Sequence, residues 1–350
     1  MKIAVLSPLW EPVPPKTYGG IELVVKLLCD GLVKRGHEVT LFASGDSETL
    51  AELKSIIPIS MREANYEVPQ FYEACEVSQI LECEQEFDVI HNHLGYLVFP
   101  FLNLFETPIV TTLHGAFCRN EEISIYKKVK NHPFVSISNS QRLPIMDLNY
   151  IDTVYNGIDV KSYTFEATPD LKDPYLAFLG RVSEEKGTHL AIQLALETNQ
   201  KLLIAGKIGS HDIEYYETKV KPLIDGKQIQ YVGEMNHAQK NVFMKNARAV
   251  IHCVTWPEPF GLVMAESMAC GTPVLALNDG SIPEVICNKK TGFIENNIED
   301  LIKHVKNIDT IDRYACRKWV EENFTAEQMI DNYLKVYNQV MTTQKSPNRA

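Results

Sequence analysis

Short apolar runs alternate with helical patterns along most of the chain. Five runs in the first part are rich in Val, Ile, Phe and Thr, and they span residues 2–7, 37–44, 87–92, 108–114 and 133–138. Strands buried on both faces of a parallel sheet have this uniformly apolar character, and the helices between them form the crossover connections. The pattern therefore predicts a first α/β domain over residues 1–165.

The alternation stops at residues 153–174, a polar stretch with an Asn-Gly turn and two prolines, and then restarts. The second series of apolar runs spans residues 175–180, 201–206, 229–234, 249–254 and 273–277. A restart after a turn-rich linker indicates a second domain, which we place at residues 166–325. Two such domains leave a cleft between them, and open parallel sheets bind ligands at the carboxyl ends of their strands.

The last part of the chain, residues 326–350, continues a helical pattern that carries large apolar side chains. We expect a C-terminal helix that packs back on the N-terminal domain, followed by a tail that is frayed from Met341 onwards. Five side chains of the final helical stretches are expected to be buried: Trp319, Phe324, Met329, Tyr333 and Tyr337.

Composition narrows the class of protein. The 350 residues are 45% hydrophobic and 23% charged, as in ordinary globular proteins. No apolar run reaches the roughly 18 residues of a membrane span, and the N-terminus is typical of a strand rather than of a signal peptide. A net charge of -11 argues against nucleic acid as a general partner. Eight scattered cysteines without a C-x-x-C pair are typical of reduced thiols, so we expect a cytoplasmic protein.

The first candidate site is a proline-rich loop that ends in Gly19-Gly20 and opens the first helix. Adjacent glycines let backbone N–H groups approach an anion closely, and the helix dipole favours a phosphate there. A glycine-rich turn without any ligand is the alternative interpretation. Because no G-x-G-x-x-G follows the first strand, the dinucleotide-binding fingerprint is missing and nicotinamide chemistry is disfavoured.

The second candidate site is the stretch "FLGRVSEEKG", in which Arg181 ends a strand and Lys186 precedes a helix that opens on Gly187. Two fixed cations beside a helix start can neutralise a diphosphate and stabilise the charge that grows on it as a leaving group. Cations on a loop are also common as solvated surface groups. The G-R-x-x-x-x-K-G spacing favours the functional interpretation.

The third candidate site is "EPFGLVMAE", which carries Glu258 and Glu266. A helix begins after the Pro-Phe-Gly turn, so Phe260, Gly261 and Leu262 supply unpaired N–H groups of its first turn. Glu266 falls inside an apolar helix, where a carboxylate is costly unless it is hydrogen-bonded. A pair of ribose or hexose hydroxyls would satisfy both of its oxygens, whereas the simpler alternative is a capped helix with one solvated glutamate.

The fourth candidate is His114, at the end of a strand of the first domain. A lone histidine there is more often structural than catalytic, but across the cleft from a phosphate site it becomes a candidate to contact the transferred group. The pair His91 and His93 has no acidic or Cys partner at matching spacing, so we assign it a core or cleft-lining role. The chain has no Asp-x-Asp pair to carry a divalent ion, and we expect no metal and no other cofactor.

Taken together, these residues resemble the family 4 retaining glycosyltransferases, over nearly the whole chain. The matching stretches are "GGIE", "GRVSEEKG", "EPFGLVMAE", "GTPVLA" and "TGF". The resemblance implies the α/β architecture called GT-B, in which two Rossmann-like, doubly wound parallel-sheet domains face a central cleft. It further implies that Arg181 and Lys186 bind the donor diphosphate, that Glu266 holds the nucleotide ribose, and that Glu258 lies by the sugar hydroxyls, close to the amides of residues 260–262.

The same resemblance implies that Gly20, next to Gly19, approaches the diphosphate and that His114 faces the sugar near its anomeric carbon. The implied reaction is retaining transfer of a hexose from a nucleotide-diphosphate sugar to a hydroxyl of a small-molecule, glycan or glycolipid acceptor. Family frequency favours UDP over GDP as the donor nucleotide. One departure is "NDGSIPE", where many relatives have a second Gly pair, so Glu284 is a weak site.

Two other functions fit parts of this pattern. A sugar-nucleotide epimerase of GT-B-like fold would need an acid and a base beside the sugar, and only His114 and Glu258 are available in a different motif layout. A non-catalytic sugar-nucleotide-binding protein has no need for leaving-group stabilisation and would be expected to lose Arg181 or Lys186. Both cations are present, which favours the transferase.

Overall fold

A computed structural model describes residues 1–17, 19–169 and 172–344 of the chain, which forms two compact units. Unit 1 comprises Met1–Gly157 and the segment from Ala326 onwards, and unit 2 comprises Ile158–Thr325. The division lies before the 165/166 boundary expected from the sequence, because Ile158 already pairs with Thr325 of unit 2. Of the tail expected to be frayed, residues up to Gln344 are helical and residues 345–350 lie outside the described part.

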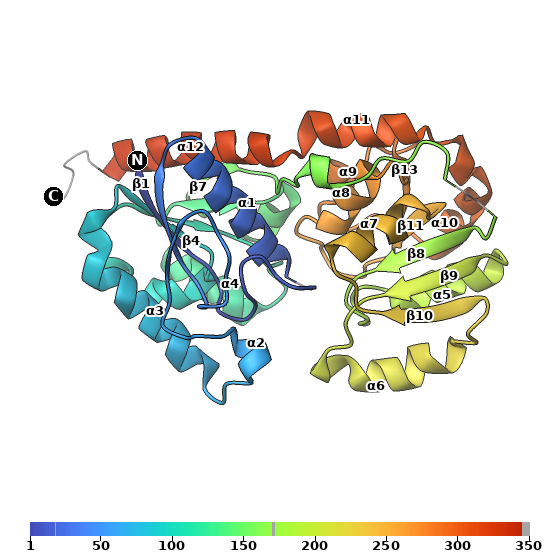
Figure 1. The fold of residues 1–350 in the computed structure, drawn as a ribbon, viewed down its shortest axis with the longest axis horizontal. Helices are drawn as coiled ribbons and strands as arrows, with labels where there is room; N and C mark the ends of the chain where they lie inside the picture. The colour runs from blue at the N-terminus through green and yellow to red at the C-terminus, as the bar shows by residue number, and fades with distance from the viewer. Residues whose placement is uncertain (18, 170–171, 345–350) are drawn as a thin grey trace. The chain divides into compact units, whose positions relative to one another are not determined.

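Unit 1 is built on a parallel sheet of seven strands in the order β3-β2-β1-β4-β5-β6-β7 (Figure 1). Its strands are β1 (Lys2–Leu6), β2 (Glu38–Phe42), β3 (Glu52–Lys54), β4 (Val89–Asn92), β5 (Ile109–Thr112), β6 (Phe134–Ser136) and β7 (Tyr150–Thr153). The five apolar runs predicted five of these strands. The two edge strands, β3 and β7, were missed because their side chains are half-buried or exposed and form no apolar run.

Helices cover the unit 1 sheet. They are α1 (Gly20–Lys34), α2 (Met61–Ala64), α3 (Pro69–Cys83), α4 (Asn120–Lys128) and α12 (Ala326–Gln344), with 3-10 turns at Glu84–Glu86, Gly95–Leu104 and Ser140–Ile145. The last helix runs along α1 and also contacts β5 and β7 (Figure 1). At the α1–α12 contact the Ile330 side chain occupies the space beside Gly31, where a Cβ would lie 2.1 Å from Ile330 Cδ1.

Unit 2 is built on a second parallel sheet, of six strands in the order β10-β9-β8-β11-β12-β13. Its strands are β8 (Tyr175–Leu179), β9 (Lys201–Ala205), β10 (Ile229–Gly233), β11 (Ala249–His252), β12 (Val274–Leu277) and β13 (Gly292–Glu295). Its α-helices are α5 (Thr188–Glu197), α6 (Ile213–Tyr215), α7 (His237–Lys245), α8 (Leu262–Ala269), α9 (Ile282–Val285), α10 (Ile298–His304) and α11 (Arg313–Asn323). Shorter turns lie at Val160–Ser162, Ser210–Asp212, Tyr216–Val220, Lys221–Leu223 and Val305–Thr310. The unpredicted strand β13 lies at the sheet edge, where two of its four residues are half-buried.

Most of the late aromatic and apolar side chains are buried, as predicted. Phe324, Met329, Tyr333 and Tyr337 are at most 2% exposed, whereas Trp319 is only half-buried. Four of the eight cysteines are buried and Cys118 is exposed, and all eight are free thiols.

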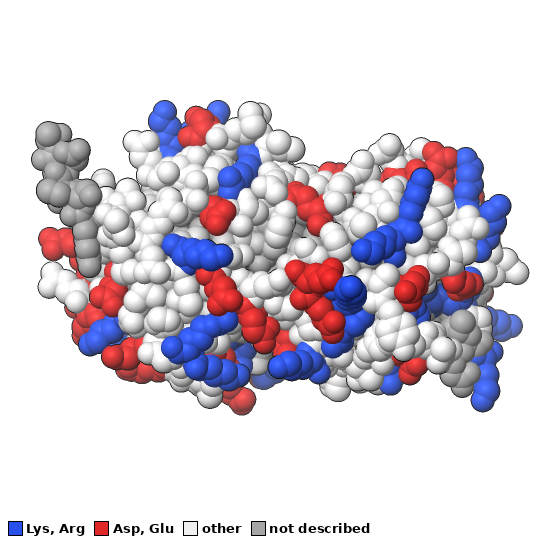
Figure 2. All heavy atoms as spheres, turned by 90° about the horizontal axis from the view of Figure 1, so that it is seen from above, with Lys and Arg blue, Asp and Glu red and all other residues white. Residues whose placement is uncertain are grey.

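Basic and acidic side chains are interspersed on the face shown in Figure 2. None of the helices in the described part of the chain combines the length and the apolar character needed to cross a bilayer.

Candidate active site

In unit 2, the loops that follow β8 and β11 meet at the carboxyl edge of the sheet. Gly187 closes the first loop with φ 69°, and a Cβ there would lie 1.7 Å from the carbonyl oxygen of Cys253. The backbone N–H of Thr255 donates to the carbonyl of Glu185 at 2.9 Å, and the Thr255 hydroxyl lies 3.4 Å from the carbonyl of Glu184. The glycine therefore lets the Arg181–Lys186 loop pack directly against the loop that carries Glu258.

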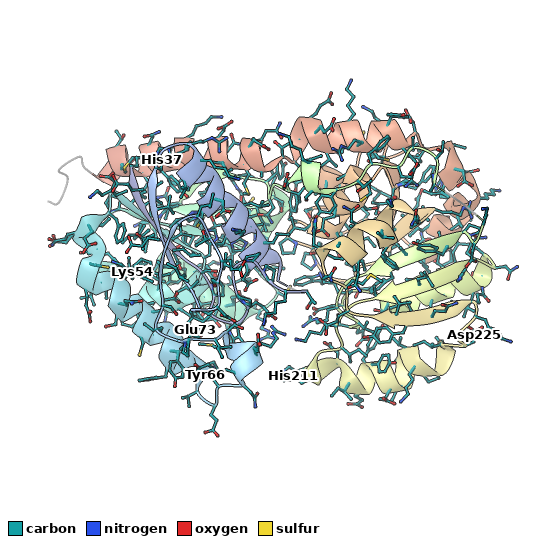
Figure 3. The ribbon with its side chains drawn as sticks, viewed as in Figure 1. His37, Lys54, Tyr66, Glu73, His211 and Asp225 are labelled. Carbon is teal, nitrogen blue, oxygen red and sulfur yellow. The ribbon has the colours of Figure 1, made fainter. Side chains whose placement is uncertain are left out.

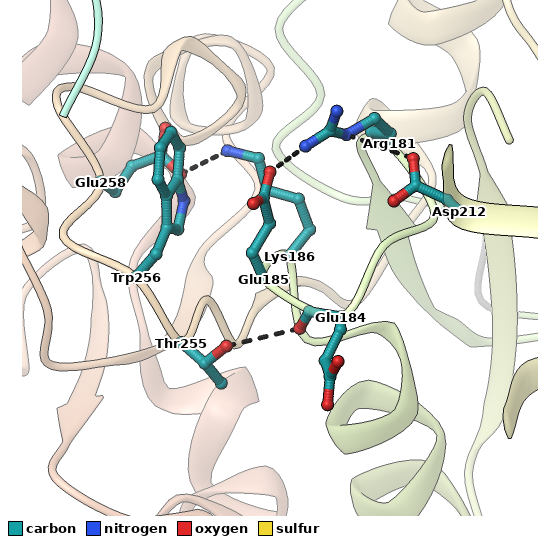
Figure 4. A network of polar contacts seen from close by, with 8 residues as sticks. All are labelled: Arg181, Glu184, Glu185, Lys186, Asp212, Thr255, Trp256 and Glu258. Atoms are coloured by element: carbon teal, nitrogen blue, oxygen red, sulfur yellow. Dashed lines mark hydrogen bonds and ion pairs between the residues drawn. The ribbon is translucent and has the colours of Figure 1, made fainter. Parts of the chain in front are cut away.

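This packing brings Lys186 to Glu258, as Figure 4 shows. Lys186 Nζ lies 2.5 Å from Glu258 Oε2, and Trp256 Nε1 donates to the same oxygen at 3.0 Å. Burial alone would raise the pKa of Glu258, which is 6% exposed, but the charge of Lys186 and the two hydrogen bonds hold the pKa below its usual value. Glu258 is therefore an ionised carboxylate with a fixed orientation.

Two glycines close around Glu258. A Cβ on Gly280 (φ 55°) would lie 2.4 Å from both the backbone N and O of Glu258, and a Cβ on Gly261 (φ 76°) would lie 3.3 Å from its Cγ. The N–H of Ser281 donates to the Glu258 carbonyl at 2.9 Å. The Asp279-Gly280-Ser281 stretch thus anchors the Glu258 backbone, and Glu284 follows it as a half-buried residue of α9.

Glu266 lies on α8 and is 4% exposed. The Tyr163 hydroxyl donates to its Oε1 at 2.8 Å, and Lys240 Nζ lies 3.3 Å from the same atom. Its burial inside an apolar helix is thus compensated by hydrogen bonds, as the cost of a buried carboxylate requires. Sequence reasoning missed Tyr163 and Lys240 because no local motif links them to Glu266.

Arg181 has different partners from Lys186. Its guanidinium pairs with Glu185 on the same loop, and its Nε lies 3.6 Å from Asp212 Oδ2 (Figure 4). Gly209 provides the space for this approach, since a Cβ there would lie 2.5 Å from Asp212 Oδ2. Arg181 and Lys186 are therefore each paired with a carboxylate of unit 2.

The turn before α8 has the geometry expected of it. The side chain of Phe260 is 1% exposed and packs edge-to-face on Phe324, with ring centroids 5.6 Å apart, so that only its backbone is available to a ligand. Gly261 is the N-cap of α8 and Leu262 its first residue, so the N–H groups that open the helix have no carbonyl four residues earlier within it. Of these, the Met264 N–H donates to the Gly261 carbonyl at 3.0 Å.

In unit 1, the start of α1 already carries a carboxyl group. Gly19 is the N-cap, with φ 148°, and a Cβ on it would lie 2.8 Å from Glu22 Oε2. Glu22 is 5% exposed, and burial raises its pKa to about 7. The anion site predicted at Gly19-Gly20 thus faces a glutamate that sequence reasoning missed.

The strand-end histidines of unit 1 form a hydrogen-bonded cluster. His114 Nε2 lies 2.7 Å from His93 Nδ1, with the two rings stacked. His91 is fully buried and bonds to the Tyr337 hydroxyl at 2.8 Å and to Thr112 Oγ1 at 2.7 Å. Burial lowers the pKa of His91 to about 3 and that of His114 to about 4, so both rings are neutral at pH 7.

One more carboxyl group of unit 1, that of Glu73, contacts the loop that follows β1. Trp10 Nε1 of this loop donates to Glu73 Oε1 at 3.1 Å, and Glu73 is labelled in Figure 3.

Within residues 1–17, 19–169 and 172–344, no group of three or more His, Cys, Asp or Glu side chains is arranged to hold a metal ion.

Comparison with known proteins identifies the family of the chain. Residues 18–162 match the model of Glycosyltransferase Family 4, and residues 159–323 match that of Glycosyl transferases group 1. The chain is 25% identical to N-acetyl-alpha-D-glucosaminyl L-malate synthase of Bacillus anthracis, with 94% of this chain and 96% of that protein covered.

Solved structures show the same fold. Sucrose-phosphate synthase of Thermosynechococcus elongatus aligns with a TM-score of 0.81 at 18% identity, over 98% of this chain and 99% of that one. HepE of Anabaena, solved in complex with UDP and glucose, aligns with a TM-score of 0.76 at 17% identity, over 97% of this chain and all (100%) of that one.

Proposed function

The chain belongs to the family 4 glycosyltransferases and has their GT-B fold of two parallel-sheet α/β units, and on this premise we propose that it is a retaining hexosyltransferase. It transfers a hexose from a UDP-sugar to a hydroxyl group of a small-molecule, glycan or glycolipid acceptor, without a metal ion. UDP is favoured because the structurally similar HepE binds UDP and glucose. The free thiols are in keeping with a reducing compartment such as the cytoplasm.

The observation that carries the proposal is a set of three charged side chains of unit 2, Lys186, Glu258 and Glu266, each of which is held by fixed partners. The first two share a direct ion pair, and the third lies on the helix that begins four residues after Glu258. In the proposed complex, Lys186 and Arg181 neutralise the diphosphate, Glu266 accepts from the ribose hydroxyls and Glu258 accepts from the sugar. The first-turn N–H groups of α8 add further donors.

The state of Glu258 favours a binding role over a nucleophilic one. Its Oε2 already accepts from Lys186 and Trp256, and its lowered pKa makes it a weak base. We therefore favour attack by the acceptor hydroxyl on the face from which the nucleotide leaves, rather than double displacement through a carboxylate. The acceptor oxygen bonds to the anomeric carbon as the bond to the phosphate oxygen breaks, and the departing phosphate takes the hydroxyl proton.

In unit 1, the neutral His114 and the glycines at the start of α1 have the roles that the family assigns to them. An uncharged imidazole can hydrogen-bond to a sugar hydroxyl without repelling the cationic centre that develops at the anomeric carbon. Gly20 would contribute its backbone N–H to the diphosphate at the start of α1.

Calorimetric binding of UDP and GDP, each with and without an attached hexose, in buffer treated with a chelator tests the proposal. We expect tight binding of one nucleotide without metal. Glu266→Ala should weaken binding of the free nucleotide, whereas Glu258→Ala should weaken only sugar-bearing donors, and Glu299→Ala, an exposed residue of the same unit, should change neither. No binding of any nucleotide, or the reverse order of the two variants, would contradict the assignment.

A further inference from the structure

Trp256 touches both members of the ion pair described above. The residue is half-buried and lies in the loop after β11, two positions before Glu258. Its indole Nε1 donates to Glu258 Oε2 at 3.0 Å, and Lys186 Nζ lies 4.7 Å from the centre of its ring. The latter distance is within the range of a cation–π interaction. Figure 4 shows the indole beside the Lys186–Glu258 contact.

The three side chains therefore form a closed triangle in which each contacts the other two. Lys186 and Trp256 both donate to the same carboxylate oxygen, Oε2, so that the two contacts fix the position of this oxygen. A lysine has a long flexible stem, and the ring face restricts where its ammonium can lie.

This arrangement has a consequence when a donor binds. In the proposed function Lys186 serves the diphosphate, so its ammonium must share or leave the contact with Glu258. A carboxylate as buried as Glu258 becomes costly when its cation is withdrawn. The indole N–H keeps one charge-assisted hydrogen bond to Oε2 during that exchange. His252 Nε2 also lies 3.8 Å from this oxygen.

We propose that Trp256 is a positioning residue for the donor sugar, which holds Glu258 by Oε2 so that Oε1 is presented to a sugar hydroxyl while Lys186 turns to the diphosphate. The proposal rests on the proposed function and adds a residue that determines how well the sugar is held. It separates two properties of one side chain: the N–H orients Glu258, and the ring face orients Lys186.

Two variants separate these properties. Trp256→Phe keeps an aromatic face for Lys186 but removes the N–H donor, and Trp256→Leu removes both. Trp319 provides a matched control within unit 2, because its Nε1 also donates a hydrogen bond, to the Val285 carbonyl at 2.8 Å, and Lys290 Nζ lies 5.6 Å from its ring centre. Trp319→Phe therefore makes the same chemical change without a carboxylate partner.

The probes are UDP, UDP-glucose, UDP-galactose and UDP-N-acetylglucosamine, measured by calorimetry and by steady-state kinetics across pH, with thermal melting of each variant. We expect Trp256→Phe to bind UDP like the wild type and to lose about tenfold or more in affinity for the UDP-sugar that binds best. The acid limb of its kcat/KM profile should move to higher pH, because Glu258 loses a donor that stabilises its ionised form. Trp256→Leu should in addition lower kcat, and Trp319→Phe should change neither affinity nor profile.

Outcomes against the role of Trp256 are distinct from outcomes against the proposed function. The positioning role is overturned if Trp256→Phe binds UDP-sugars as tightly as the wild type. It is also overturned if this variant loses the same affinity for UDP and for UDP-sugars and its pH profile of kcat/KM does not move. If the wild-type protein binds UDP and none of the UDP-sugars, the role of Trp256 is likewise overturned. Failure of the wild-type protein to bind any nucleotide instead overturns the proposed function, and this inference with it.

Discussion

Two buried glutamates show how differently the two units treat charge. Glu258 of unit 2 is 6% exposed and Glu76 of unit 1 is 1% exposed. The pKa of Glu258 is lowered because Lys186 and two hydrogen bonds outweigh the effect of burial, whereas burial and the nearby Glu73 raise the pKa of Glu76 well above its usual value. Neither carboxyl oxygen of Glu76 has a hydrogen-bond partner among the described residues.

The contrast extends to the other polar groups of each unit. Arg181, Lys186 and Lys240 each pair with carboxylates in unit 2, while burial lowers the pKa of His91 and His114 in unit 1 and keeps their rings neutral. The region around Lys186 and Glu258 in unit 2 therefore maintains paired charges, and the region around His91 and His114 in unit 1 maintains neutral hydrogen-bonding groups. The difference between Glu258 and Glu76 teaches that burial alone does not decide whether a carboxyl group is ionised, because a cation and hydrogen-bond donors can outweigh it.

The strongest test of this contrast removes Lys186, the cation that pairs with Glu258 in unit 2. We expect Lys186→Ala to lower kcat by about 10²–10³-fold, because its charge meets the charge that is largest on the leaving group in the transition state. Donor affinity should fall much less. The exposed Lys219 of the same unit supplies the control Lys219→Ala, and equal losses in kcat and affinity for Lys186→Ala would reduce Lys186 to a simple binding residue.

In unit 1 the corresponding test removes the carboxyl group of Glu22, whose pKa is raised towards neutral pH. The pKa of Glu22 is raised to about 7 from 4.5, so its contribution to stability is full below pH 4.5 and is lost as pH rises through 7. Glu22→Gln should therefore gain on the order of 3 kcal/mol in unfolding free energy at about pH 8 and nothing at about pH 4.5. Urea unfolding at both pH values measures this, and a gain that does not depend on pH would show that ionisation is not the cause.

A smaller effect is expected from the neutral network itself. Tyr337→Phe removes the hydroxyl that bonds to His91 Nδ1 and should cost about 1–2 kcal/mol of stability, because it leaves a buried ring nitrogen without its partner. Nucleotide binding in unit 2 should not change. Tyr314, 63% exposed, provides the control Tyr314→Phe, and a loss of nucleotide affinity in Tyr337→Phe would contradict the separation of the two networks.

The smallest effect is expected from salt. Raising NaCl from about 0.1 M to about 1 M shortens the screening length and should weaken UDP binding a few-fold, since binding depends on charges near the surface of unit 2. The stability loss caused by Tyr337→Phe should be the same at both salt concentrations, because that network carries no charge. If salt changed UDP binding and the stability loss of Tyr337→Phe to the same extent, the distinction between a charged network in unit 2 and a neutral one in unit 1 would be wrong.

Sequence spacing indicates the charged contacts of unit 2 more directly than the neutral hydrogen bonds of unit 1, for a physical reason. Arg181 and Lys186 share one loop, and Glu258 and Glu266 share one turn and helix, so their spacing carries the signal. Contacts between distant segments leave no such signal: Tyr163 reaches Glu266 across 103 positions, and Tyr337 reaches His91 across 246. Trp256 was missed although it adjoins Glu258, because its role depends on a lysine 70 positions earlier in the chain.

The same reason explains what could be predicted of the fold. Interior strands are apolar on both faces and were recognised, and so was the edge strand β10, which still forms an apolar run. The edge strands β3, β7 and β13 have exposed or half-buried residues and were not recognised. Gly280 illustrates the limit at the site: the sequence presented it as a departure from a pattern, and only the packing showed that its missing Cβ makes room for the backbone of Glu258.

The return of α12 to unit 1 also sets the order in which a nascent chain can be completed. Synthesis proceeds from the N-terminus, so Thr112 and His91 emerge from the ribosome long before Tyr333 and Tyr337, which lie 221 and 246 positions later. Unit 2 is contiguous and is complete in sequence before α12 is made. The first-made unit is therefore finished last, and His91 of β4 and Thr112 of β5 lack their tyrosine partners until α12 is made.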